Sequence, residues 1–494
     1  MARAPPDEQL LDSVEAESAT VLSLLDHAAI VYFRFVLAPI VYRKLPEHSG
    51  PAIVWMLAQK DPMVMHSICA FAGRSVCDKV TLLPGDAQAR RSLAMEHYSA
   101  SLRLLHVVLH DYDRGHGLNC ILATLWLMIA YEQKFGDGSG KGLNTHLQGA
   151  ATLFQERLRD MRGVLSQDFS SNSSAEALTA VMKAGSLEHS ISPVTCQLIV
   201  WIALLDSGAA LNGIGGAFNR VVGECLIGPD ADNIALRLSS FQALQARSDM
   251  ARFAIWTSSY ARDQLAEDVQ NSQIFTLEAE AGQLRFMLSL LDDPEQATVS
   301  DMDSLSSAYR RNHDDTRNTA SHQHGCLAIA RAIHDINNRY HSLLETANLF
   351  QISDMESPSQ KRFVINVRYI VSFYHAVVLC FLRIIHGQRP LVREQQVALR
   401  EIMMLASKAY GDYGDQSLAV FAWPLFVVAL ESDDMIHKNW IVERYESLAR
   451  GGENLLRARD ALRIVIREQQ EFGDRYIGYA ELVRREGIGR FVLL

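Results

Sequence analysis

The sequence predicts an all-α fold, and three observations support this prediction. Apolar residues recur at three- and four-residue steps, as in residues 92–110, which is the periodicity of an amphipathic helix. No segment alternates apolar and polar residues, and no Asn-Gly or Asp-Gly turn joins two β-branched runs. The chain is 48% hydrophobic and 21% charged, a composition that can bury a sizeable core. We therefore expect a large, irregular helical array with an internal apolar cavity.

The first helix is predicted to begin near Pro6 and to run to about Leu25. Asp7 and Glu8 fall in its first turn, where the positive end of the helix dipole favours acidic side chains. A second apolar stretch, residues 28–41, follows with almost no break. The chain should therefore open with two closely spaced helices.

The clearest periodicity lies in residues 92–110, where five apolar positions share one stripe of the predicted helix. This stripe is expected to face the core. Its members are Ala94, Tyr98, Leu102, Leu105 and Leu109.

Two long apolar helices are predicted in the C-terminal half, at residues 370–385 and 418–430. Pro424 should kink or start the second of them, because proline cannot donate a helical hydrogen bond. Polar or breaker-rich stretches predict loops between helices. These loops are residues 136–142, 166–174, 292–304, 313–325 and 353–360.

The domain organisation predicted is one helical domain over residues 1–494. A subdivision into residues 1–165 and 176–494 is an alternative, with residues 166–175 as a mobile loop between them. No repeat of solenoid length is present. The helices should therefore pack irregularly.

Charge and cysteine content restrict the class of protein. The formal net charge is -10, with no Lys/Arg-rich run, which disfavours direct nucleic-acid binding. The seven cysteines are scattered and mostly apolar in context, as expected of free thiols in a reducing, intracellular compartment. The N-terminus lacks the pattern of a signal peptide, and the apolar runs 120–131 and 196–205 look too short to span a bilayer. We expect no membrane span.

Several sequence blocks occur in an order typical of a known family. They are residues 24–27 (LLDH), 60–62 (KDP), 67–73 (SICAFAG), 97–105 (HYSASLRLL), 118–132, 146–150 (HLQGA), 421–431 (FAWPLFVVALE) and 452–454 (GEN).

Together these blocks resemble the fungal-specific regulatory domain that lies downstream of six-cysteine binuclear zinc clusters. The resemblance implies a helical regulatory and interaction region, in a family whose DNA reading is done by the separate zinc cluster. No six-cysteine cluster or basic segment is present in this sequence. The resemblance therefore implies a nuclear or cytoplasmic regulator that does not contact DNA directly.

Two histidine-containing segments are candidates for chemistry, and both have a simpler interpretation. His146 should be a structural histidine in a helix, with Gly149 and Ala150 allowing another helix to approach closely. His322, His324 and Cys326, with His313 nearby, are plausible metal ligands, but no second cluster completes a tetrahedral shell. A solvated loop that leads into a helix at Cys326 is the better interpretation.

The sharpest chemical pattern is the four-residue spacing of Asn337, His341 and Glu345, which would place them on one helix face. It resembles the Mg²⁺-binding motif of class I terpene cyclases, with His in place of the hydroxyl residue and no Asp-rich partner motif. In that alternative Asp335 and Asp206 would add metal ligands.

Arg339 and Tyr340 would bind a substrate diphosphate in the same alternative. The simpler interpretation of the whole segment is a solvated polar face. Asp206 lies in an apolar run and must be paired or hydrogen-bonded if it is buried. The resemblance to the fungal regulatory domain implies a structural cap or a helix contact for this residue. Residues 213–216 are glycine-rich but do not follow a strand, so they are not a dinucleotide fingerprint.

The functional expectation is a regulator without a cofactor, connected with secondary metabolism. It would bind a small apolar ligand, a protein partner or a second copy of itself as a homodimer. The alternative is a non-canonical sesquiterpene cyclase, or another secondary-metabolite cyclase, that uses Mg²⁺ and a prenyl diphosphate in the helical cavity. A third possibility is a truncated gene model with a zinc cluster upstream.

Overall fold

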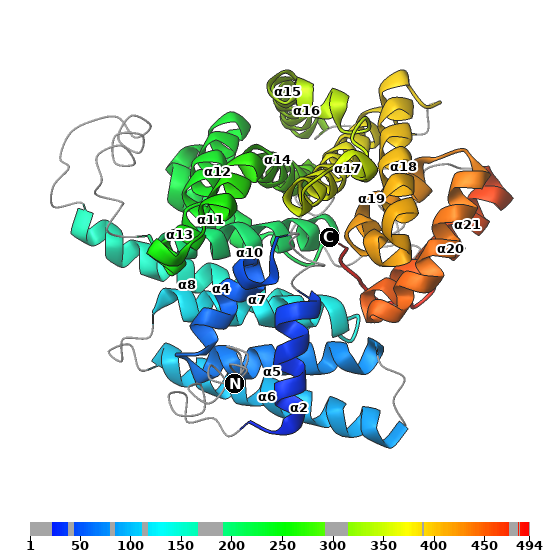
Figure 1. The fold of residues 1–494 in the computed structure, drawn as a ribbon. Coiled ribbons are helices and arrows are strands. Elements are labelled where there is room, and N and C mark those ends of the chain that lie inside the picture. The colour runs from blue at the N-terminus through cyan, green and yellow to red at the C-terminus, as the bar shows by residue number, and fades with distance from the viewer. Residues whose placement is uncertain are drawn as a thin grey trace, which may run out of the picture.

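The computed structural model describes residues 22–37, 44–79, 84–110, 117–165, 191–291, 315–387, 390–473, 483 and 485–493. Every regular element within these ranges is helical, which confirms the predicted all-α class (Figure 1). The expected first helix before Leu22 and the expected mobile loop at 166–175 lie outside the described residues.

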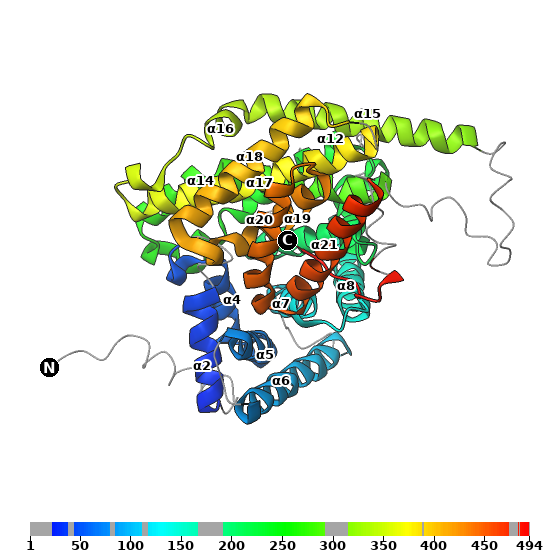
Figure 2. The same cartoon turned by 90° about the vertical axis from the view of Figure 1, so that its right-hand side faces the viewer.

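The helices of the N-terminal half surround one apolar core (Figures 1 and 2). Helix α10 runs through the middle of the molecule and contacts both α7 and α14. The elements in this half are α2 (Leu24–Tyr32), a π-helical turn (Phe33–Leu37), a 3₁₀ turn (Pro46–His48), α4 (Gly50–Ala58), α5 (Pro62–Lys79), α6 (Pro84–His110), α7 (Leu118–Phe135), α8 (Lys141–Leu165), α10 (Pro193–Leu211) and α11 (Ala217–Ile227).

Most of the remaining helices build a second apolar core around α14 and α17, whereas α13 packs on the N-terminal core through Ala251. The α-helices are α12 (Ile234–Ser248), α13 (Ala251–Trp256), α14 (Arg262–Leu291), α15 (Asp315–Arg339), α16 (His341–Thr346), α17 (Pro358–His386), α18 (Arg393–Tyr413), α19 (Ala422–Glu431), α20 (Met435–Leu448) and α21 (Glu453–Phe472). Short 3₁₀ segments lie at Gly228–Asp230, Thr257–Ser259, Ile352–Asp354, Gly414–Phe421 and Ala449–Gly451.

Two long helices, α10 and α17, each start at a Ser-Pro sequence. Ser192 caps α10 by accepting from the backbone N–H of Thr195, and Pro193 occupies the first turn, where its missing N–H costs nothing. Ser357 and Pro358 start α17 in the same way, with Gln360 completing a capping box. These local signals fix where each buried helix begins.

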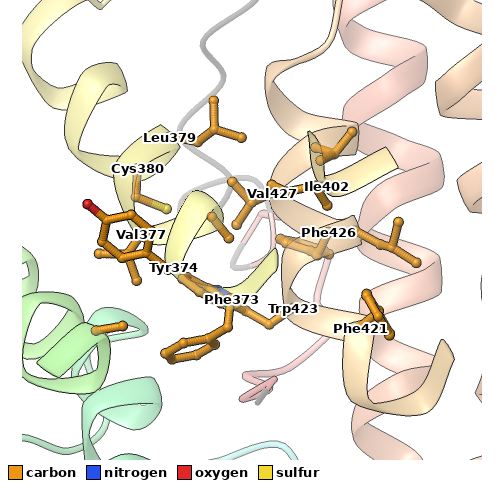
Figure 3. Packing of buried hydrophobic residues seen from close by; sticks show 14 of the residues in the cluster. Phe373, Tyr374, Val377, Leu379, Cys380, Ile402, Phe421, Trp423, Phe426 and Val427 are labelled. Carbon is orange, nitrogen blue, oxygen red and sulfur yellow. The ribbon is translucent and has the colours of Figure 1, made fainter. Parts of the chain in front are cut away.

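In the second core, buried apolar side chains of α17, α18 and α19 pack together (Figure 3). Phe373 packs on Trp423 with ring centroids 5.1 Å apart, and the buried Arg285 guanidinium lies 4.0 Å from the centre of a Trp423 ring. Pro424 lies in the first turn of α19, directly after a 3₁₀ segment. The expected role of Pro424 in starting a helix is confirmed.

The length argument against membrane-spanning helices was wrong. The helices continue beyond the apolar runs, so α10, α17 and the stretch Arg393–Glu431 are long and apolar enough to cross a membrane by length and composition. Their most apolar windows are 83%, 56% and 67% buried within the fold. More than half of each window therefore packs within the fold.

Two further expectations need correction. Residues 315–325 of the predicted loop 313–325 belong to helix α15, while the two residues before them are not described. In α6 the predicted buried stripe is divided, because Ala94 and Leu105 are buried whereas Leu102 and Leu109 are exposed. The polar residues His97 and Ser101 take the inner positions, which the apolar periodicity could not reveal.

The C-terminal segment joins the two cores. Val492 packs in the N-terminal core, while its neighbours Phe491 and Leu493 pack in the second core. The Val492 carbonyl accepts from Asn454 Nδ2 at 3.0 Å, and the Leu493 carbonyl accepts from Arg285 Nη2 at 2.7 Å. This segment, 490–493, is called the clasp below.

Candidate functional site

The predicted metal-binding face is not one continuous helix. Helix α15 ends at Arg339, and α16 begins at His341 after Tyr340, whose φ and ψ are -105° and 16°. Asn337 Oδ1 accepts a hydrogen bond of 2.9 Å from the Tyr374 hydroxyl of α17. The structure therefore uses Asn337 for a helix contact.

Arg339 and Tyr340, the expected diphosphate ligands, both bind a buried carboxylate. Arg339 Nη1 and the Tyr340 hydroxyl donate to the two oxygens of Glu280 on α14, at 2.5 and 2.7 Å. Gln242 of α12 also donates to Glu280, at 2.6 Å. Glu280 is fully buried. The ion pair with Arg339 offsets its charge, and the bonds from Arg339 and Tyr340 fasten the α15–α16 junction onto α14.

Asp206 caps a neighbouring helix. Its Oδ1 accepts from the N–H of Gly216 at 2.7 Å, and its Oδ2 accepts from the N–H and Nδ2 of Asn219 at 2.8 and 2.9 Å. These groups lie at the start of α11, so the buried carboxylate satisfies backbone donors that the helix leaves open. Burial raises the pKa of Asp206 to about 6, in spite of these hydrogen bonds. Asp206 therefore has the structural capping role that was expected.

The remaining expected ligands are not gathered around one ion position. Asp335 and Glu345 are exposed. Within the described part of the chain, the group of three His, Cys, Asp or Glu side chains whose ligand atoms converge lies elsewhere, on α2, α5 and α6. A Mg²⁺ site built from Asp206, Asp335 and Glu345 therefore has no support in the geometry.

His146 belongs to a buried hydrogen-bonded group. The Tyr98 hydroxyl donates to Glu132 Oε1 at 2.8 Å and lies 2.6 Å from His146 Nε2. Burial lowers the pKa of His146 to about 4, so the imidazole is neutral near pH 7. Gly149, in contrast, has open space where a Cβ would lie. The expectation that Gly149 permits a close helix approach was wrong.

His322 and His324 lie on α15 and are exposed, with Cys326 half-buried one turn later. Their helical position replaces the solvated loop expected from the sequence. Among the described residues, no further His, Cys, Asp or Glu side chains converge with His322, His324 and Cys326 to form a metal site.

The hollows found between the helices are small. Three have volumes of about 20, 20 and 30 Å³, each enough for about one water molecule. The most apolar of them lies between α17 and α19, beside Cys380 and Trp423. A prenyl diphosphate or drug-sized ligand needs several hundred Å³. In this conformation these hollows do not accommodate such a ligand.

The outer side of α6 carries an exposed apolar stripe. Met95, Leu102 and Leu109 are 51%, 36% and 46% exposed, and their seven-residue spacing places them on one face of the helix. Arg91 and Arg103 are exposed on the same helix. Figure 2 shows α6 at the edge of the molecule, with α5 on its inner side. We refer to these five side chains as the α6 outer face.

Sequence reasoning missed the α6 outer face because Leu102 and Leu109 were assigned to the buried stripe and Met95 was assigned to neither side. The sequence does contain a signal for this face. Met95, Leu102 and Leu109 recur every seven residues, and this spacing places them on a different side of the helix from Ala94 and Leu105.

The fold and these contacts define an all-helical domain whose buried polar groups mostly hold helices together. The family profile of the fungal-specific transcription factor domain matches residues 32–490. The chain therefore belongs to this family, and no zinc cluster is detected in it. No curated protein and no solved structure matches the chain.

Proposed function

We propose that this protein is a transcriptional regulator that acts through a protein partner, without contacting DNA itself. Membership of the transcription factor domain family supports the regulatory role. The net charge of -10 and the lack of a basic run argue against a direct contact with DNA. Such a role places the protein in the nucleus, together with a partner that is bound to DNA.

The α6 outer face is the observation that carries the choice of a protein partner. Three large apolar side chains on one helical line fit the apolar stripe of a second helix, and two arginines beside them favour acidic residues in that helix. A small-molecule ligand is less well supported, because the hollows found hold about one water each. The partner proposed is therefore an acidic amphipathic helix.

A tethering assay tests this proposal. The chain would be fused to a heterologous DNA-binding domain in yeast, and transcription from a matching reporter would be measured. The triple variant Met95→Gln, Leu102→Gln, Leu109→Gln should abolish the effect of the fusion on the reporter. The matched control is Leu265→Gln, Val269→Gln, Leu327→Gln, which changes three exposed apolar residues on α14 and α15. The control should retain the effect.

Equal reporter activity from the two triple variants, with both folded by circular dichroism, would contradict the assignment of the α6 outer face. A fusion that leaves the reporter unchanged in every form would contradict the regulatory role itself. A shift from monomer to dimer that the α6 variant abolishes would identify the partner as a second copy of the chain.

A further inference from the structure

Three metal-ligand side chains from three helices converge beneath α6. They are Asp26 of α2, Cys69 of α5 and His97 of α6, and one ligand atom of each lies within 4.8 Å of the other two. All three are buried, with residue exposures of 4%, 2% and 8%. The residues are far apart in the sequence, so only the packing of α2, α5 and α6 brings them together.

The carboxylate and the imidazole are already oriented by neighbours. Asp26 Oδ1 lies 2.8 Å from His97 Nε2, while Asp26 Oδ2 accepts from the backbone N–H and the hydroxyl of Ser23, both at 2.8 Å. His97 Nδ1 lies 2.7 Å from His66 Nδ1. Each group therefore has one atom that faces the cluster and another that is held by a second residue.

We propose that Asp26, Cys69 and His97 bind a zinc ion. Thiolate sulfur, imidazole nitrogen and carboxylate oxygen are the ligands that Zn²⁺ takes in proteins. A thiolate and a carboxylate also cancel the two positive charges of the ion, which matters because the cluster is buried. A water molecule would complete the tetrahedron.

The existing contacts suit such an ion with small adjustments. His97 would coordinate through Nε2, and its Nδ1–H would donate to His66, which fixes the ring orientation as an outer-shell partner. Ser23 would hold the non-coordinating oxygen of Asp26 in the same manner. The separation of Asp26 Oδ1 and His97 Nε2 would widen from 2.8 Å to about 3.3 Å, the edge of a zinc tetrahedron.

Cys69 distinguishes a zinc site from a purely structural hydrogen-bonded group. Burial raises the pKa of its thiol, so without a metal the sulfur stays protonated and is a weak hydrogen-bonding group. When zinc binds, the thiol proton passes to solvent and the sulfur coordinates as the thiolate. The hydrogen bonds among Asp26, His97 and His66 form without Cys69, whereas a zinc site requires it.

The test uses the purified full chain, stripped of metal with a chelator and titrated with Co²⁺ as a spectroscopic substitute for Zn²⁺. We expect saturation at one equivalent per chain, with tetrahedral visible bands and a thiolate-to-cobalt charge-transfer band. Added Zn²⁺ should remove both sets of bands. The Cys69→Ala variant should lose the charge-transfer band, and His97→Gln should bind Co²⁺ at least tenfold more weakly.

Cys196→Ala is the matched control, because Cys196 is an equally buried thiol on α10 outside the cluster. It should retain the full cobalt spectrum. If Cys69→Ala fails to fold, the effect of Zn²⁺ on thermal unfolding tests the zinc site instead. The midpoint of thermal unfolding should then rise on adding Zn²⁺, both in the unmodified chain and in Cys196→Ala. No charge-transfer band in the unmodified chain, or an unchanged band in folded Cys69→Ala, would overturn the proposal. Neither readout depends on transcriptional activity, so the zinc site and the proposed regulatory function can fail separately.

Discussion

Gly149 and Gly215 occupy helical and turn positions that differ sharply in the space around them. A Cβ on Gly149 meets no atom within 4 Å, whereas a Cβ on Gly215 would lie 2.7 Å from Ala209 Cβ and 2.8 Å from Asp206 Oδ1. We expect Gly149→Ala to raise the free energy of unfolding by about 0.5–1 kcal/mol, because alanine restricts the unfolded chain. Gly215→Ala should lower it by about 1–3 kcal/mol through overpacking beside the Asp206 cap. Urea unfolding of both variants measures these changes, and equal effects would contradict the two environments described.

Glu278 should make the stability of the protein depend on pH near neutrality. Burial raises the pKa of this carboxyl to about 7 from its ordinary value of 4.5, partly offset by a hydrogen bond from Tyr369. The folded state therefore binds a proton that the unfolded state releases, and this contribution to stability is full below pH 4.5 and lost as pH rises through 7. Glu278→Gln stays uncharged at every pH.

The difference in unfolding free energy between the Glu278→Gln variant and the unmodified chain should therefore shift by about 3 kcal/mol in favour of the variant between pH 4 and pH 8. Chemical denaturation at the two pH values measures the shift. Glu345→Gln removes an exposed carboxyl and is the control. A shift of the same size in the control would show that Glu278 is not the group responsible.

A buried carboxylate, Glu280, is one of the attachments of the C-terminal end of helix α15. Glu280 accepts from Arg339, Tyr340 and Gln242, which come from the end of α15, the residue after it and α12. Glu280→Ala should lower the free energy of unfolding by about 2–4 kcal/mol, since it leaves the Tyr340 hydroxyl without its acceptor in a buried place. Hydrogen exchange should report faster exchange in residues 322–339 while α10 stays protected. Glu345→Ala, on the neighbouring α16, is the control, and similar exchange rates in both variants would refute the anchoring role.

The elements show how far sequence reasoning extends. The helical class and the existence of α6 and α17 could be predicted from apolar periodicity and apolar runs, because these signals are local. The Ser-Pro starts of α10 and α17 are equally local signals, but they were not recognised, and residues 358–360 were assigned to a loop. The break at Tyr340 and the partners of Arg339 could not be predicted, because they depend on Glu280, about 60 residues away in the chain. The convergence of Asp26, Cys69 and His97 was equally hidden, since no spacing in the sequence links three residues on separate helices.

The whole molecule is held together by the clasp as well as by α10. The backbone N–H of Arg490 donates to the Gly138 carbonyl at 2.7 Å, and the Val492 carbonyl accepts from Gln133 Nε2 at 3.2 Å and from Asn454 Nδ2. Removal of residues 490–494 should lower the free energy of unfolding by about 5 kcal/mol, since three large apolar side chains leave the cores. Calorimetry should then show unfolding at a lower temperature, and an unchanged midpoint would contradict the role of the clasp.

A smaller change keeps this prediction testable if the truncated chain does not fold. Val492→Ala should lower the free energy of unfolding by about 1–2 kcal/mol, since it removes two buried methyl groups from the N-terminal core. Phe472→Ala, a side chain that is 69% exposed at the end of α21, should cost less than about 0.5 kcal/mol. Equal losses would contradict the packing of the clasp.

The clasp also has a consequence for biosynthesis. Val492 completes a core whose other members, apart from Ala279, lie between Leu22 and Ala251. During translation that core must wait for about 240 further residues, and then for residues 490–493 to leave the ribosomal tunnel, before its last apolar gap is filled. The N-terminal core thus lacks one of its apolar side chains while the second half of the chain is translated, so chaperones that shield apolar surfaces on nascent chains should bind it during that interval.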